Sequence, residues 1–147
     1  MNIFKTIDKV LAGFGNIKAM ERNHVDTFTE DLIQNIKGTK LAESKLGQLF
    51  GSFQNLAGYE FLNVSILSTT NIKTLKGCEL VFETDKRSIL IPSDTKEIES
   101  DFSNVSNIWL TKVSFILNES EKNMIVNGSF KSVTLNFKKR SLKMFKV

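Results

Sequence analysis

The sequence predicts an α+β domain in which N-terminal amphipathic helices pack on a strongly curved antiparallel sheet or open barrel of roughly six to seven strands. Apolar residues recur at helical spacing through residues 1–58 and alternate with polar residues through 59–147. Short connections in the second part favour antiparallel pairing. Because 147 residues are a usual length for one domain, we expect a single domain, with a helical part (1–58) and a β part (59–147).

Three helices are predicted in the first part. The first covers residues 3–17, where apolar side chains form one stripe. The second begins at Asp26 or Thr27, because Thr27 and Glu30 have capping-box spacing, and it ends before Gly38. The third covers residues 41–56, and its predicted stripe consists of Leu46, Leu49, Phe50, Phe53 and Leu56.

The second part reads as strands. Strands are predicted at residues 62–66, 78–83, 88–91, 97–99, 105–117, 122–137 and 142–145. Residues 84–87 form a tight turn, and Pro92, which has no amide donor, ends a strand or lies on an edge strand. Residues 118–121 are expected to be a polar hairpin loop, and Asn127–Gly128 a bulge within the long strand that follows.

Composition restricts the class of protein. Hydrophobic residues make up 41% of the chain and charged residues 24%, as in folded globular domains. Cys78 is the single cysteine, so no internal disulfide forms and no oxidising compartment is required. No apolar run approaches the ~18 residues of a membrane span, and early charges interrupt any signal-peptide core. We expect a cytoplasmic protein, with attachment to a membrane surface as the open alternative.

The chemistry needed for catalysis is sparse in this sequence. His24 is the only histidine, which restricts histidine-based metal sites and catalytic triads. Cys78 is in phase with Leu80 and Phe82 and is therefore expected in the core. No glycine-rich nucleotide motif occurs. These observations favour a protein without a cofactor and without an enzymatic activity.

Acidic residues offer one weak candidate for a metal or acid–base site. Asp94, Glu97, Glu99 and Asp101 cluster in a polar stretch, and carboxylates can bind a hard cation or transfer protons. Their spacing is not that of an EF-hand loop. A solvated loop is the ordinary interpretation, and a carboxylate- or metal-dependent enzyme is the lesser alternative.

Basic residues are concentrated at the C-terminal end of a chain whose net charge is +4. They lie after residue 130 without any acidic residue among them: Lys131, Lys138, Lys139, Arg140, Lys143 and Lys146. Cross-strand pairing and protection of an edge strand explain them without a ligand. The alternative is an anionic partner or a membrane surface, for which the candidate residues are Phe4, Lys5, Lys9, Lys138, Lys139, Arg140 and Lys143.

The leading hypothesis from the sequence is a non-enzymatic intracellular binding or scaffold protein. It would engage a protein or peptide through the sheet face, the sheet edge or the mouth of the barrel. A peripheral membrane or lipid-binding protein is the alternative, using the N-terminal helix and the C-terminal lysines. A nucleic-acid partner is not expected, because arginines are few and no basic–aromatic consensus occurs. A homodimer formed by edge pairing remains open.

Overall fold

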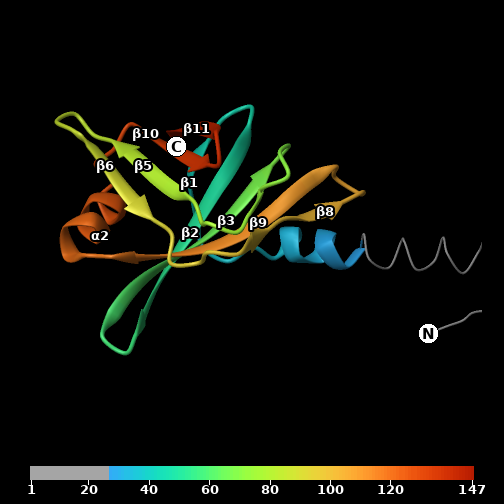
Figure 1. Ribbon diagram of the computed structural model, residues 1–147, viewed down its shortest axis with the longest axis horizontal. Helices are drawn as coiled ribbons and strands as arrows, with labels where there is room; N and C mark the ends of the chain where they lie inside the picture. The colour runs from blue at the N-terminus through green and yellow to red at the C-terminus, as the bar shows by residue number, and fades with distance from the viewer. Residues whose placement is uncertain (1–26) are drawn as a thin grey trace, which may run out of the picture.

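A computed structural model describes residues 27–147 of the chain (Figure 1). The predicted helix at residues 3–17, and with it Phe4, Lys5 and Lys9, lies outside the described residues. The second predicted helix is confirmed over residues 27–34. Glu30 attaches this helix to the sheet, since its carboxylate accepts hydrogen bonds of 2.8 Å from the hydroxyls of Ser103 and Ser106. No helix in the described part is long and apolar enough to cross a membrane.

The described residues form one antiparallel sheet that curls into a half-barrel (Figure 1). Its nine strands lie in the order β6-β5-β10-β11-β1-β2-β3-β9-β8. In chain order they are β1 (Thr39–Glu43), β2 (Gly47–Leu56), β3 (Tyr59–Ser68), β5 (Glu79–Glu83), β6 (Ser88–Pro92), β8 (Asp101–Ser103), β9 (Ile108–Leu117), β10 (Ser132–Phe137) and β11 (Arg140–Lys146). A separate pair joins β4 (Lys73–Thr74) to β7 (Ile98–Glu99). The curved antiparallel sheet was therefore predicted correctly, but the strand number was too low.

The predicted helix at residues 41–56 is wrong, because these residues form the end of β1 and all of β2. Strand β2 has apolar side chains on both faces, with Leu49 buried on one and Phe50 and Leu56 on the other, so its sequence imitates a helical stripe. Glycines argue against the helix, since each costs about 1 kcal/mol in a helix interior. A Cβ at Gly51 would lie 2.8 Å from a Leu41 side-chain atom and 3.0 Å from one of Leu62, so glycine lets the neighbouring strands' side chains pack there.

The predicted strand at residues 122–137 is also wrong in its first half. Helix α2 (Glu119–Val126) replaces the expected loop and the start of the strand. The Asn118 side chain accepts a 2.7 Å hydrogen bond from the Glu121 amide, and the Glu121 carboxylate accepts one of 2.9 Å from the Asn118 amide. This capping box fixes the start of the helix. Asn127 is its C-cap rather than part of a bulge.

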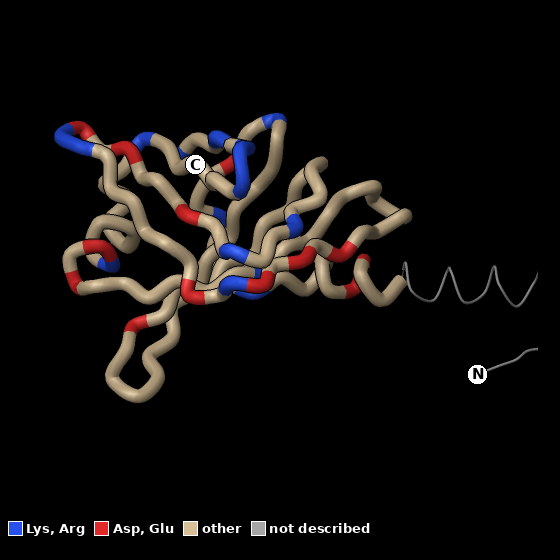
Figure 2. The backbone as a smooth tube through the Cα atoms, viewed as in Figure 1, with Lys and Arg blue, Asp and Glu red and all other residues tan. Residues whose placement is uncertain are grey.

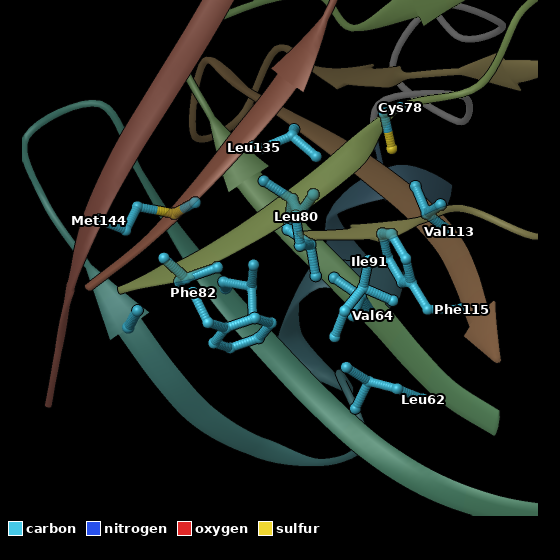
Figure 3. Packing of buried hydrophobic residues seen from close by; sticks show 14 of the residues in the cluster. Leu62, Val64, Cys78, Leu80, Phe82, Ile91, Val113, Phe115, Leu135 and Met144 are labelled. Carbon is cyan, nitrogen blue, oxygen red and sulfur yellow. The ribbon is translucent and has the colours of Figure 1, made fainter. Parts of the chain in front are cut away.

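The concave side of the sheet holds the core. Alternate side chains of β3, β5, β9, β10 and β11 point toward one another there (Figure 3). Leu62, Leu80, Phe82, Phe115 and Leu135 are fully buried. A single bridge between Ser93 and Phe115 joins the end of β6 to β9. Helix α2, which connects β9 to β10, lies on the same side of the sheet, and its Met124 and Ile125 side chains are buried in the core. The helix therefore links two strands that are far apart in the order of the sheet.

Candidate functional site

A cavity of about 890 Å³ opens at the end of the half-barrel where β5, β6 and β10 meet, and five of its lining residues are lysines. We call it the lysine pocket. It is lined by Lys73, Thr74, Leu75, Lys76, Gly77, Cys78, Glu79, Pro92, Lys96, Asn136, Phe137, Lys138 and Lys139. These residues come from three separate parts of the sequence, which the neighbouring strands β6, β5 and β10 bring to one place. Figure 2 shows the course of the backbone with its basic and acidic residues coloured.

The floor of the pocket is held by hydrogen bonds between two of these segments. The Ser93 hydroxyl accepts a 3.0 Å bond from the Cys78 amide and donates a 2.6 Å bond to the Thr95 carbonyl. The Gly77 amide donates to the Lys96 carbonyl at 2.8 Å. Gly77 has φ +81°, and a Cβ there would lie 2.7 Å from the Ser93 hydroxyl oxygen. The close approach of the two segments therefore depends on glycine at this position.

A tight hairpin presents the third segment. Phe137 and Arg140 pair directly in the β10–β11 ladder, so Lys138 and Lys139 form the two-residue turn between them. Lys138 has φ +53°, a left-handed conformation that is uncommon outside glycine. The hairpin thus holds two adjacent ammonium groups at the rim of the pocket on a short connection.

Positive charge dominates the pocket. Lys73 lies 3.5 Å from Glu99 in an exposed ion pair, and the Lys96 ammonium donates to the Ser93 carbonyl at 3.2 Å. Within residues 27–147, the other three lysines of the pocket form no ion pair: Lys76, Lys138 and Lys139. Glu79 is the single acidic residue in the lining. The pocket therefore has an excess of cationic groups available to a ligand.

Cys78 lies in the pocket wall, where burial disfavours the thiolate form of its side chain. Its side chain was predicted in the core, and it is buried. Burial raises the pKa of its thiol to about 11, and the nearby charge of Glu79 acts in the same direction. Because the thiolate is the reactive form, the pocket offers no activated thiol.

The acidic candidates from the sequence do not converge on one point. Asp94, Glu97, Glu99 and Asp101 are all exposed, and Glu99 is paired with Lys73. Among the residues that the structure describes, no three His, Cys, Asp or Glu side chains gather where they could hold a metal ion.

The basic candidates divide into two groups. Lys138 and Lys139 line the pocket, whereas Arg140 and Lys143 are exposed on β11 and do not. Sequence reasoning missed Lys73, Lys76 and Lys96, which complete the lysine pocket. No local pattern marks them, because only the pairing of distant strands places them beside the β10–β11 turn.

Comparison of the chain with protein-family models, with curated proteins and with solved structures gave no match.

Proposed function

We propose that this chain is a non-catalytic binding protein that recognises an acidic segment of a partner protein at the lysine pocket. The observation that supports this function is the gathering of five lysines from three chain segments around one cavity, with a single glutamate among them. Lysines that only solvate a surface would not need to come together from three chain segments around one cavity. A concave site lined by one sign of charge raises the local concentration of oppositely charged ligands.

The size of the expected energies defines the ligand further. An exposed ion pair contributes only ~0.2–1 kcal/mol, whereas micromolar affinity requires about 8 kcal/mol. Charge alone is therefore insufficient, and apolar contact must supply the rest at roughly 25 cal/mol per Å². The pocket provides it, since Leu75 is 75% exposed and Pro92 is exposed beside it. The ligand that fits best has carboxylates next to apolar side chains, as an acidic peptide segment does.

The lining favours a protein over a nucleic acid. It contains no arginine, although arginine is the residue best suited to forked phosphate contacts. Its one aromatic side chain, Phe137, is only 3% exposed, so bases would find no ring on which to stack. Lysine ammonium groups with apolar neighbours suit flexible carboxylates instead.

The test is binding of a fluorescent peptide that alternates Glu with Leu, measured by anisotropy at low and at high salt. We expect wild-type protein to bind it with micromolar affinity that weakens as salt rises. The double variant K138E/K139E should bind at least 10-fold more weakly, because two attractive charges at the rim become repulsive. The matched control K37E/K45E carries the same change of net charge on exposed residues outside the pocket and should bind as wild type does.

Two outcomes would overturn this function. Equal weakening by K138E/K139E and K37E/K45E would reduce the effect to overall charge. Salt-sensitive binding to vesicles containing anionic lipid, lost in K138E/K139E while the peptide fails to bind, would assign the pocket to a membrane surface instead of a protein.

A further inference from the structure

A second surface lies at the edge of the sheet formed by β6, two strands from β10, which leads into the turn that carries Lys138 and Lys139. Strand β6 is the last strand on its side and pairs with β5, and just past its end the Ser93–Phe115 bridge meets β9. The Ser93 amide donates to the Cys78 carbonyl and the Thr84 amide donates to the Arg87 carbonyl. Since hydrogen-bonded and non-hydrogen-bonded pairs alternate in an antiparallel ladder, Ile89 and Ile91 bond to β5. The backbone groups of Ser88 and Leu90 therefore point away from the sheet.

Strand β6 has few of the features that usually protect an edge. Natural edges carry charges, bulges or a covering element, yet the β6 sequence Ser-Ile-Leu-Ile-Pro is uncharged and its register with β5 is continuous. Leu90 is 52% exposed. Only Pro92, at the end of the strand, removes a donor. The opposite edge differs: β8 has three residues, and helix 27–34 binds its last residue, Ser103, through Glu30.

A groove runs beside this edge. A cavity of about 490 Å³ lies between the β5–β6 hairpin and α2, and its lining includes Arg87 and Ile89 on one side and Ser120 and Met124 on the other. Neighbouring strands lie about 4.8 Å apart, so one added strand needs little room. Helix α2 and the hairpin flank the edge, and a second folded copy of this chain would have to pass them to pair there.

We infer that the β6 edge and its groove bind an extended peptide segment of a partner protein by strand addition. Ser88 and Leu90 supply outward amides and carbonyls, so a segment of about three residues can pair along the edge. The exposed Leu90 side chain gives the added strand an apolar neighbour. This inference does not rest on the lysine pocket, because Ser88 and Leu90 do not line it; Pro92, at the end of β6, does.

The test uses a variant that removes one outward donor. Leu90→Pro deletes an amide that does not bond to β5, so the β5–β6 ladder stays intact, as it does at Pro92. A random nonapeptide library is selected on wild-type protein, and the selected peptides are measured on wild type, L90P and K138E/K139E. We expect peptides that bind wild type, lose about 5- to 10-fold in affinity on L90P, as for one backbone hydrogen bond, and are unaffected by K138E/K139E.

Amide exchange provides the second measurement. In the free protein the Leu90 amide should exchange quickly and the Ile91 amide slowly, and a selected peptide should slow exchange at Leu90. The inference is overturned if no peptide is enriched, or if the selected peptides bind L90P as tightly as wild type. A concentration-dependent dimer that L90P abolishes would also overturn it, and would assign the edge to a second copy of the chain.

Discussion

At the scale of single residues, Cys78 couples stability to pH. The pKa of its thiol rises from 9.0 to about 11 in the folded protein, so folding favours the protonated thiol. The stability from this neutral thiol is fully present below pH 9, and it is lost between about pH 9 and 11 because the unfolded chain releases its proton first. At about 1.4 kcal/mol per pKa unit, the complete loss is about 3 kcal/mol, of which about 2 kcal/mol has occurred by pH 11.

The measurement is urea unfolding of wild type and Cys78→Ala from pH 8 to 11. Both proteins carry the same other ionisable side chains, so the difference between their free energies of unfolding isolates the thiol. We expect the wild-type curve to fall by about 2 kcal/mol more than the variant curve over this range. Parallel curves would show that the folded protein accommodates the thiolate without penalty.

At the scale of secondary-structure elements, the capping box decides whether α2 forms. This helix has eight residues, too few to be stable alone, and it has two buried side chains. We predict that Asn118→Ala destabilises the protein by about 1 kcal/mol, because the Glu121 amide loses its acceptor. Asn118→Asp keeps that acceptor and should unfold at nearly the wild-type urea concentration. If both variants lose the same stability, the cap is not the cause.

The sequence contained this cap, and its spacing was overlooked. Asn118 and Glu121 are three residues apart, the distance that identified the second helix at Thr27 and Glu30. Alternation correctly identified β3 and β5, because one face of each is buried and the other is less so, and the tight turn at residues 84–87 identified β6. Strand β2 escaped detection, because apolar residues lie on both of its faces and hide the period of two. Local patterns predict an element well only when a single face decides its burial.

At the scale of the whole molecule, the candidate site depends on the order of the strands, because β6, β5 and β10 are neighbours in the sheet and their ends carry the three segments of the pocket. Lys138 and Lys139 were recognisable within the basic C-terminal segment, but Lys76 and Lys96 join them because β5 pairs with β10 at Glu79 and Asn136 and the Gly77 amide donates to the Lys96 carbonyl. Spacing along the chain carries no information about that pairing, since it depends on which distant strands become neighbours. The fold class was therefore predictable and the composition of the pocket was not.

The crossing at which residues 93–94, just after β6, meet β9 also contributes to stability. Besides the Ser93–Phe115 bridge, the Asp94 amide donates to the Ser114 carbonyl at 2.8 Å, and the Ser93 hydroxyl fastens this crossing to the Cys78 amide. Ser93→Ala leaves that amide without its acceptor in a buried position, which costs about 1–3 kcal/mol. Because the same hydroxyl holds the pocket floor, the variant should also bind the acidic peptide more weakly.

Chemical denaturation and amide exchange test this coupling. In S93A we expect faster exchange at Cys78 and Asp94 together, with a lower free energy of unfolding. Ser88→Ala is the matched control, since its hydroxyl bonds only to the exposed Glu83 carboxylate and its loss should change stability by less than about 0.5 kcal/mol. If S93A is no less stable than S88A, backbone bonds alone close the half-barrel, and the pocket floor does not depend on the Ser93 side chain.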